Sequence, residues 1–493
     1  MTTLLLLAPV AVPMLAALAY LAFGWRPATA WISAASAALV LAAAITSAAE
    51  VATTGPRTAL GGLLRVDALS AFMLIVIGAV ALLATAATPA HLSAEIDADR
   101  ATPRTAARHS LLVQAFLAAM ALAVSSADLG VLWIAVEATT IVTAFLVGQR
   151  RTRSAVEAAW KYVVICSTGI ALALLGTILL NYASQHTAAA AGLDWAGLVA
   201  SAHTLDPGVT RIAVALLVIG FGAKAGLAPL HAWLPDAHSQ APAPVSALMS
   251  GVLLSVAFYA VLRVKVIADA ALGAGFTRTL LVIMALASLV LAASLLMAQR
   301  DYKRMLAYSS IEHMGLLALA AAVGGPLAMA AALLHVLGHG LAKGVLFLSA
   351  GRILQTTGAS RIEGVRGLAA RQPLLAGCVG FGVLALIGLP PFSVFASELG
   401  IARAGLASGL GWATVLALIL VLVIAAALIT HTSRMLLGTP PDGPGAATAV
   451  PRLPVSAATA LVVGLLVCAG VGITTGPLTD LLRSAATIVT GTP

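Results

Sequence analysis

The sequence is dominated by apolar runs of about 20 residues that follow one another along almost the whole chain. A transmembrane helix needs about 20 consecutive apolar residues, so each run is long enough to cross a bilayer once. Composition agrees, because 61% of the 493 residues are hydrophobic and 9% are charged, whereas soluble domains carry about 25% charged residues. The sequence therefore predicts an all-α polytopic membrane protein.

The apolar runs predict about 14 transmembrane helices. They are expected near residues 3–23, 29–48, 66–88, 109–127, 129–148, 155–182, 210–230, 244–264, 279–298, 306–323, 328–350, 374–402, 411–437 and 455–475. We divide the chain into four regions along these helices. They are three N-terminal helices (1–108), two groups of five helices (109–265 and 266–437), and a C-terminal helix with its tail (438–493).

Basic residues are unevenly divided between the two sets of loops. Cytoplasmic loops carry an excess of Lys and Arg, and with the N-terminus outside, the inner loops hold about twice as many of them as the outer loops. The first apolar run has no basic segment before it and leads directly to another, so we expect a retained helix and no cleaved signal. We predict a multi-pass protein of the plasma (inner) membrane with both termini outside.

Other function classes lack their usual sequence signals. The net charge of +9 comes from basic residues spread over short loops, so no nucleic-acid partner is expected. Cys166, Cys378 and Cys468 stand alone in apolar runs, which favours neither an iron–sulfur cluster nor a disulfide framework. The sequence has no Walker loop and no nucleophile–base pair. We expect no cofactor and no metal in this chain, and place any redox centres in partner subunits.

One predicted helix is interrupted partway by Gly and Pro residues. The run GFGAKAGLAPLHAWLPDAHSQAPAPVSALMSG begins at Gly220 and places Lys224 just before the interruption. An ammonium group near the bilayer centre costs roughly 2.5 to 3.5 kcal/mol on insertion scales, and proline removes backbone donors that hydrocarbon cannot replace. Non-helical backbone at this depth survives only where it is buried in protein or lines a wet cavity. We therefore interpret this stretch as part of an ion path.

Glu137 lies in the middle of another apolar run, LGVLWIAVEATTIVTAFLVG. A carboxylate at this position needs a cation or water nearby to stay ionised. We interpret Glu137 as the partner of Lys224, because a changing distance between the two would let the lysine take up and release a proton. A protonated structural glutamate and a static buried salt bridge are the alternatives.

Three titratable residues occupy one side of a later predicted helix. His335, His339 and Lys343 follow each other at i, i+4 and i+8 in LLHVLGHGLAKGVLFLSAG, which aligns them along one face. This arrangement is typical of a proton relay. Two histidines at i and i+4 could instead hold zinc, but no HExxH motif or further ligand cluster accompanies them. Purely structural hydrogen bonding is the other alternative.

A second interrupted run, GLPPFSVFASE, follows the first by about 165 residues and ends at Glu398. Breaks at corresponding positions in two halves indicate an internal repeat with the transport path at its discontinuous helices. Glu398 would end the row of titratable groups. Glu312 and His313, in MLAYSSIEHMGLL, could join the relay or occupy a solvated helix end near the inner surface.

Three further residues are secondary candidates. His231 and His238 fall in the first break, where they could carry protons or satisfy exposed backbone groups. Lys161 follows Glu157 by four residues at the start of the sixth predicted helix, an order that stabilises helices. A local ion pair at the membrane face is the simpler interpretation of Glu157.

Together these motifs resemble the antiporter-like membrane subunits shared by respiratory complex I, Mrp cation/proton antiporters and membrane-bound hydrogenases. The resemblance rests on Glu137 and on KAGLAPLHAWLPDAHSQAPAPVSAL, KRMLAYSSIEHMG, HVLGHGLAKGVLFLSAG and GLPPFSVFASELG. Within this family, WIAVEATTIVTAFLVG, EAAWKYVVICSTGIALALLGT and SIEHMG are most similar to the branch of hydrogenase-4 component F.

The resemblance implies two inverted five-helix repeats, formed by helices 4 to 8 and 9 to 13, with helices 7 and 12 broken. It implies that Glu137 is the glutamate of helix 5, Lys224 the lysine of helix 7 and Glu398 the terminal charge of helix 12. His339 and Lys343 would fall in the central polar region.

Helix 8 departs from the family pattern. Family members often carry a lysine or histidine there, whereas SALMSGVLLSVAFYAV has only Ser246, Ser250, Ser255 and Tyr259 as polar residues. Either a bound water bridges Lys224 to the central region or the path differs.

The resemblance implies a proton-translocating subunit of a membrane redox complex of the hydrogenase-4 or NADH:quinone oxidoreductase (complex I) type. Such a subunit carries no redox reaction itself. It would move protons, with sodium as the alternative ion, while other membrane and peripheral subunits transfer electrons. A subunit of an Mrp-type cation/proton antiporter is the second hypothesis, and a structural membrane anchor with an inactive channel is the third. Buried charges at Lys224 and Glu137 argue against the anchor.

The loop charges generate a topology prediction. In a background that lacks the three native cysteines, an impermeant maleimide added to intact cells should label His203→Cys and leave Arg151→Cys unlabelled. Permeabilised cells serve as the control, because both positions should then react. Labelling of Arg151→Cys alone in intact cells would reverse the predicted orientation.

Overall fold

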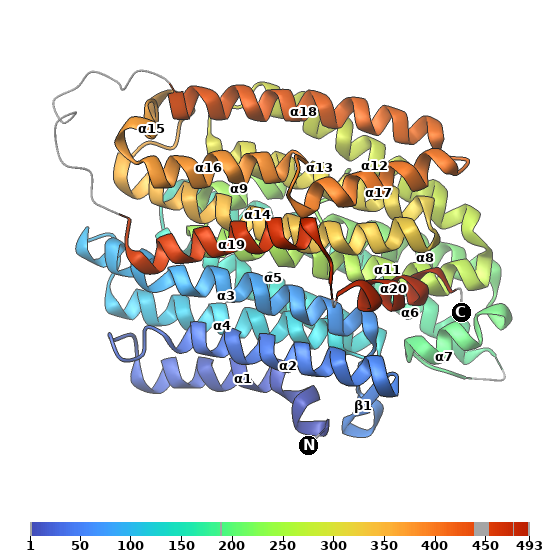
Figure 1. Cartoon of the computed structure of the whole chain (residues 1–493). Helices are drawn as coiled ribbons and strands as arrows, with labels where there is room; N and C mark the ends of the chain where they lie inside the picture. Colours follow the sequence, from blue (N-terminus) through green and yellow to red (C-terminus); the bar gives the residue numbers. More distant parts are fainter. Residues whose placement is uncertain (1, 188–189, 438–452, 477, 492–493) are drawn as a thin grey trace.

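The computed structural model describes residues 2–187, 190–437, 453–476 and 478–491. In this part of the chain, 13 helices are long and apolar enough to cross a membrane. They lie side by side in one bundle, together with one short β-hairpin (Figure 1). The twelfth predicted crossing, near 374–402, is divided between two shorter helices. The prediction of an all-α polytopic membrane protein is confirmed.

The first half of the chain forms the two strands and the helices that lead to the centre of the bundle. They are α1 (Thr2–Phe23), α2 (Ile32–Thr54), β1 (Arg57–Ala59), β2 (Leu64–Val66), α3 (Ala68–Asp97), α4 (Pro103–Ser125), α5 (Leu129–Val147), α6 (Arg153–Gln185), α7 (Trp195–Ala200), α8 (Pro207–Lys224), α9 (Trp233–Gln240), α10 (Ala243–Leu248), the π-turn η4 (Met249–Leu253) and α11 (Leu254–Leu272). The strands pair antiparallel, with Thr58 opposite Arg65.

The second half continues the bundle. Its helices are α12 (Ala274–Met297), α13 (Tyr302–Val323), α14 (Gly325–Thr357), α15 (Leu368–Arg371), α16 (Pro373–Leu386), α17 (Ser393–Ala407), α18 (Gly411–Leu437), α19 (Val455–Ile473) and α20 (Leu478–Thr490). Short 3₁₀ turns cover Leu60–Gly62, Gly148–Arg150, Ala202–Thr204 and Ile362–Gly364. Residues 438–452, at the start of the predicted C-terminal region, lie outside the described part. The division into four regions stays a prediction.

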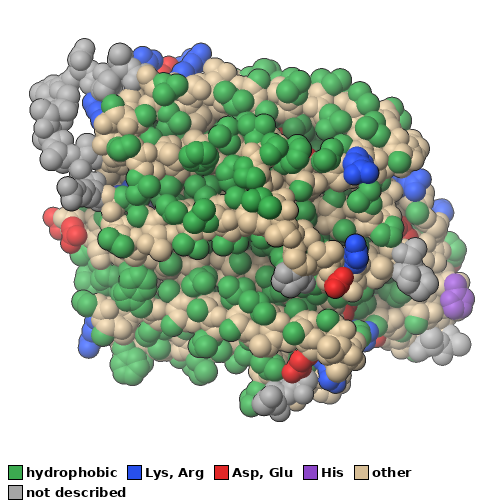
Figure 2. All heavy atoms as spheres, in the orientation of Figure 1, with side chains coloured by type: hydrophobic (Ala, Val, Ile, Leu, Met, Phe, Trp, Pro, Cys, Tyr) green, Lys and Arg blue, Asp and Glu red, His purple; other side chains and the backbone are tan. Residues whose placement is uncertain are grey.

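Burial separates central from peripheral helices. The most apolar segments of the continuous span 243–272 and of α14 are fully buried, whereas those of α18 and α19 are 33% and 28% buried. The surface in Figure 2 is covered mainly by hydrophobic side chains, with charged side chains gathered mostly toward the two ends of the helices. This distribution fits a bundle whose outer helices face lipid or partner helices.

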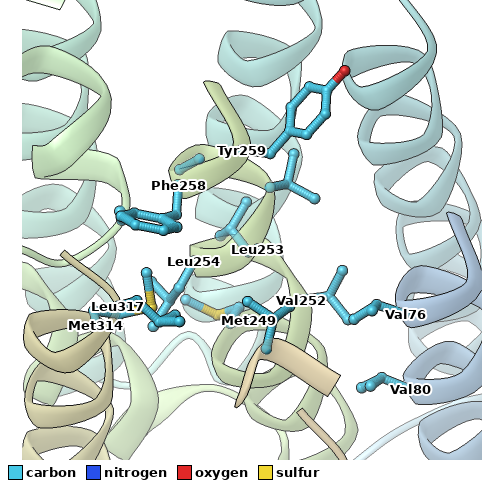
Figure 3. Close-up of a cluster of buried hydrophobic side chains, with 14 of the residues drawn as sticks. Val76, Val80, Met249, Val252, Leu253, Leu254, Phe258, Tyr259, Met314 and Leu317 are labelled. Atoms are coloured by element: carbon cyan, nitrogen blue, oxygen red, sulfur yellow. The ribbon is translucent and has the colours of Figure 1, made fainter. Parts of the chain in front are cut away.

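At the centre, the π-turn η4 packs between α3, α13 and α14. Figure 3 shows Met249 and Val252 of this turn among apolar side chains that include Val76 and Met314. The turn approaches α14 closely, because a Cβ built on Gly340 would lie 2.7 Å from the carbonyl oxygen of Gly251. Glycines at both positions therefore allow the two central helices to cross at backbone contact.

Both predicted breaks are present and begin in the same way. Helix α8 ends at Lys224 and α16 ends at Leu386, and each end is followed two residues later by a glycine with positive φ. Gly226 has φ +80° and Gly388 has φ +67°, a region that L side chains rarely adopt. The glycines end the first half of each crossing, and α9 and α17 form the second halves.

The count of loop charges placed Arg263 and Lys265 on the outer side and Lys303 on the inner side, and this assignment to loops was wrong. Arg263 and Lys265 lie in α11, with 1% and 6% exposure, and Lys303 lies in the first turn of α13 with 2% exposure. Lys265 and Lys303 fell just outside the predicted helices 244–264 and 306–323, because hydropathy windows stop at charges, and Arg263 was the last residue but one of its predicted helix. When Arg263 and Lys265 are left out of the outer count and Lys303 out of the inner count, the excess of basic residues in the inner loops becomes larger.

Arg263 forms a buried ion pair with a residue far away in the sequence. Its guanidinium lies 2.7 Å from Asp67 Oδ1, donates to Ser70 Oγ at 3.0 Å, and lies 4.0 Å from the ring centroid of Trp195. Burial alone would raise the pKa of Asp67, but Arg263 and the hydrogen bonds from Ser70 outweigh it and lower that pKa below its ordinary value. The pair joins α11 to the start of α3.

Candidate functional site

Lys224 is the last residue of α8, and its side chain is fully buried. Its Nζ donates hydrogen bonds to Thr140 Oγ1 on α5, at 2.8 Å, and to the hydroxyl of Tyr162 on α6. Nζ also lies 4.7 Å from the centroid of the Tyr162 ring, within cation–π range. Neutral oxygens and an aromatic face therefore hold the ammonium group directly beside the first break, where the sequence predicted it.

Glu137 lies on α5, three residues before Thr140, so the two side chains share one face of the helix. Its side chain is partly buried, and its Oε2 has no hydrogen-bond partner among the described residues. Within the same part of the chain, the carboxylate makes no ion pair with Lys224 inside 4.0 Å. Direct pairing of Glu137 with Lys224 stays a prediction.

The break between α8 and α9 is tied back to α8. Trp233 Nε1 donates to the carbonyl oxygen of Ala223 at 3.0 Å, and its ring packs edge-on against Tyr162 with centroids 5.0 Å apart. His231 Nδ1 lies 3.2 Å from the carbonyl oxygen of Pro229. Both side chains contact backbone carbonyls exposed by the break, which is the simpler of the two roles predicted for His231.

Lys161 lies at the surface, apart from the buried groups. Its side chain is 47% exposed and pairs with Glu157 at 2.8 Å and with Asp236 of α9 at 3.0 Å. Asp236 also pairs with Arg304 of α13 at 2.6 Å. The local ion pair expected from the i, i+4 spacing is present, and Asp236 extends it into a network that links α6, α9 and α13.

His238 of α9 belongs to the buried groups. It is 0% exposed, and its ring stacks on Phe347 of α14 with centroids 4.9 Å apart. Phe347 follows Lys343 by one helical turn, so His238 lies against the face of α14 that carries the predicted relay. Neither ring nitrogen of His238 has a hydrogen-bond partner in the described part of the chain.

The three relay candidates of α14 are fully buried. Lys343 Nζ donates to the carbonyl oxygen of Leu306, at 2.6 Å, and to Ser309 Oγ, both on α13. His335 Nε2 lies 3.0 Å from Nδ1 of His313, also on α13. The relay face of α14 is therefore directed toward α13, and Lys343 finds neutral oxygen ligands as Lys224 does.

A hydrogen-bonded row extends from this face to α17. The rings of His339 and His313 lie 4.8 Å apart, His313 is bonded to His335, and His335 Nδ1 lies 2.9 Å from Ser397 Oγ. Ser397 directly precedes Glu398. The histidines predicted from α14 are thus connected to the second broken helix through one residue of α13 and one hydroxyl of α17.

The alternative of a solvated helix end for Glu312 and His313 is wrong. Both lie midway along α13, where they are 3% and 0% exposed. Because α13 begins at Tyr302 and its first turn is itself buried, the middle of the helix lies well inside the protein. Glu312 Oε2 has no hydrogen-bond partner within the described ranges.

Glu398 lies directly against the second break. A Cβ built on Gly388 would stand 2.1 Å from its Oε2, so the carboxylate occupies the space that a side chain at Gly388 would fill. The side chain is partly buried, and Oε1 lacks a hydrogen-bond partner among the residues described. Glu398 therefore ends the row of titratable groups at the position predicted from the sequence.

The sequence left open a zinc site on His335 and His339, but the structure brings a different set of potential ligands together. The rings of His335 and His339 are stacked 6.4 Å apart, whereas ligand atoms of His313, His335 and Glu398 lie within 4.8 Å of one another. Zinc–ligand distances of about 2.0 to 2.2 Å require a tighter set. His313 and His335 also bond to each other, so the geometry suits proton exchange better than coordination.

The hydroxyl groups of the span 243–272 (α10, η4 and α11) have separate partners, except Ser255, whose Oγ has none among the described residues. Ser246 Oγ donates to the carbonyl oxygen of His238 at 3.1 Å, and Ser250 Oγ lies 2.8 Å from Ser310 Oγ. Tyr259 donates to the carbonyl oxygen of Val124 and accepts a hydrogen bond from Arg263. The break therefore supplies, through His238, a buried titratable group where α10 and η4 offer only hydroxyl groups.

Several contact residues were missed in the sequence. Thr140, Tyr162, Ser309 and Ser397 are neutral and common in membrane helices, so no sequence signal separates them from other hydroxyl residues. Lys303 donates to the carbonyl oxygens of Ser239 and Ala241, at 3.1 and 2.8 Å, at the C-terminal end of α9. The sequence signal that could have identified Lys303 as a buried contact residue was its position next to an apolar run.

Comparison with known proteins gives a family match over most of this region. The profile of the NADH:quinone oxidoreductase/Mrp antiporter transmembrane family matches residues 126–425. A hydrogenase-4 component F homolog from Methylacidiphilum infernorum is 42% identical over 313 residues, which are 62% of this chain and 65% of the relative. This chain thus matches less than two thirds of that relative's length.

Two other similarities cover nearly the whole chain. Subunit N of F(420)H(2) dehydrogenase from Methanosarcina mazei is 31% identical over 439 residues, 86% of this chain and 85% of the relative. A chain in the structure of the membrane-bound sulfane sulfur reductase, an archaeal respiratory membrane complex, superposes with a TM-score of 0.85 at 25% identity, covering 99% and 97% of the two chains. The expected resemblance is confirmed: this chain belongs to the NADH:quinone oxidoreductase/Mrp antiporter transmembrane family.

Proposed function

We propose that this chain is a proton-translocating membrane-arm subunit of a multisubunit redox complex of the hydrogenase-4 or complex I type. The observation that carries the proposal is the succession of buried titratable side chains between the two broken helices. These are the fully buried Lys224, His238, Lys343, His339, His313 and His335, together with the partly buried Glu398. Buried ionisable groups in membrane helices are costly and mark ion pathways.

The contacts of these groups suit proton exchange. A neutral imidazole donates through one ring nitrogen and accepts through the other, and a hydroxyl group does both. The bonded row His313, His335 and Ser397 can therefore pass a proton toward Glu398 by exchanging donor and acceptor roles. Lys224 and Lys343 sit on hydroxyl groups that can act as either donor or acceptor. A lysine can gain or lose its proton there without leaving an opposite charge unpaired.

Partner subunits would drive the movement. We propose that electron transfer in other membrane and peripheral subunits changes the state of this chain, and that the chain itself binds no cofactor. Protons are the transported ion in this proposal, with sodium as the alternative. The protein would lie in the plasma membrane with both termini outside, as the loop charges indicate.

A cation/proton antiporter is the second candidate, because the matching family includes Mrp antiporters. We expect redox subunits, such as hydrogenase-like or quinone-reductase-like proteins, to copurify with this chain in mild detergent. Mass spectrometry of the purified assembly distinguishes the candidates. Recovery of small membrane subunits alone would favour the antiporter and contradict the redox complex.

Lys224→Ala should abolish most proton translocation while leaving assembly intact. The variant removes a buried proton-transfer group and leaves only the hydroxyls of Thr140 and Tyr162, which can bond to water or to each other. We expect translocation to fall by about 100-fold or more, the usual contribution of a positioned proton-transfer group. The measurement is acidification by the purified complex in proteoliposomes, followed with a pH-sensitive dye.

Lys161→Ala is the matched control for Lys224→Ala. It removes a lysine of the neighbouring helix that is half exposed and paired at the surface, so proton translocation should stay close to the unmodified level. Normal pumping at normal turnover by Lys224→Ala would contradict the proposed path.

Variants of Glu137 separate a switch from a static salt bridge. Glu137→Gln removes the charge that would hold the Lys224 ammonium, so pumping should fall while the complex still assembles. Glu137→Asp keeps the charge with a shorter reach and should retain partial function. Breaking a static buried pair costs about 3 to 5 kcal/mol of stability, so that alternative predicts loss of assembled complex. Subunit abundance and pumping per complex are measured side by side.

Lost abundance with unchanged pumping per complex, in Glu137→Gln, would refute the switch and support the static pair. The contacts of Lys224 favour the switch, because its hydrogen bonds to Thr140 and Tyr162 hold the ammonium without the carboxylate.

A further inference from the structure

A large groove lies outside the proposed proton path, between α4, α5 and α6. Its volume is about 1150 Å³.

 The groove is larger than a second pocket, of about 530 Å³, which lies beside Arg300, Arg366 and Arg434. It opens at the end of the bundle where α5 leads into α6.

The rim of the groove is strongly basic. Its lining residues include Arg100, Arg104, Arg108, Arg150 and Arg151, and no Asp or Glu. Glu95 lies beneath the rim and pairs with Arg100 at 3.1 Å and with Arg150 at 3.9 Å. Among the described residues, no carboxylate lies within 4.0 Å of the other three arginines. The rim therefore carries more positive charge than the protein itself neutralises.

The wall below the rim is apolar and exposed. Ile141 and Phe145 of α5 are 55% and 53% exposed, and Trp160 of α6 is 66% exposed. Ile141 lies six residues before the end of α5, about 9 Å along the helix axis. The guanidinium of Arg108 lies 5.5 Å from the ring centroid of Phe145, at the boundary between the two layers. Charge at the end and apolar side chains one to two turns deeper give the groove two distinct layers.

We propose that this groove binds an anionic phospholipid, with its phosphate on the arginine rim and an acyl chain along Phe145, Ile141 and Trp160. Arginine forks match phosphate oxygens, and basic pockets between transmembrane helices bind anionic headgroups. Exposed tryptophan is favoured at the level of the headgroups. An acidic soluble segment would fit the rim but would leave the apolar wall uncovered, so the two layers together favour a lipid.

The site is independent of the proposed proton path, although it shares two helices with it. Thr140 and Tyr162, which hold Lys224, lie on the buried sides of α5 and α6. The groove uses the opposite, exposed sides of the same helices. A bound lipid would therefore pack against the outside of the wall that surrounds Lys224.

Binding is tested on the complex purified in mild detergent and stripped of lipid. Its melting temperature is followed as phosphatidylglycerol, phosphatidylcholine or inorganic phosphate is added. Phosphatidylglycerol should raise the melting temperature, whereas phosphatidylcholine and inorganic phosphate should have little effect. Arg104→Ala combined with Arg108→Ala should weaken phosphatidylglycerol binding by about tenfold or more, because each removes a charge contact near the headgroup.

The matched control combines Arg211→Ala with Arg278→Ala. These arginines are also exposed, and Arg211 lies 5.9 Å from the ring centroid of Phe276, but neither lines the groove. The control should bind phosphatidylglycerol as the unmodified complex does. Equal binding by the groove variant, or an equal effect of phosphatidylcholine, would overturn the proposal. A full effect of inorganic phosphate would identify a free-phosphate site and would also overturn it.

A photocrosslinker placed at Trp160 distinguishes lipid from protein in the assembled complex. Crosslinking to phospholipid supports the proposal. Crosslinking to another subunit would show that the groove is a protein interface and would contradict it. Neither experiment measures proton translocation. The lipid site can therefore be refuted while the proposed function stands, and the proposed function can be refuted while the lipid site stands.

Discussion

An ammonium group inside a membrane bundle must find oxygen ligands within the protein, and the arrangement of the central helices follows from this requirement. Lys224 and Lys343 are both fully buried, and each bonds to hydroxyl or carbonyl oxygens of neighbouring helices. A carboxylate partner would bind more strongly, but removing the charge of one partner would then cost about 3 to 5 kcal/mol. Neutral ligands such as Tyr162 and Ser309 stabilise the charged lysine and still tolerate the neutral one.

The backbone of the broken helices also needs hydrogen-bond partners within the protein. A break at membrane depth exposes carbonyl groups that water does not reach, so side chains must bind them. Trp233 binds the carbonyl of Ala223 at the end of α8, and Lys303 binds two carbonyls at the end of α9. Since Lys303 comes from α13, the second half of the chain completes the break of the first half. Helix α9 thus links the surroundings of Lys224 to those of Lys343.

The sequence predicted the helices, both breaks and the principal charged residues, because these depend on local properties. Apolar length sets the helices, and glycine and proline set the breaks at Gly226 and Gly388. Contacts between distant segments were not predictable in this way. Arg263, at the end of the predicted helix 244–264, was counted among the loop charges, and its partner Asp67 lies 196 residues earlier in the chain. A charge pair of this kind is recognisable only when the packing of α3 against α11 is known.

Two neighbouring residues of α6 show why residue type alone does not decide which side chains join the proposed path. Lys161 lies in an apolar run and looked similar to Lys224 in sequence, yet its side chain is 47% exposed and is paired with two surface carboxylates. Tyr162 carries no charge, yet it is fully buried and contacts the Lys224 ammonium. One step along a helix turns a side chain by about 100°, enough to move it from the surface to the interior. A lysine in an apolar run therefore indicates a proton path only when its helix directs it toward the centre of the bundle.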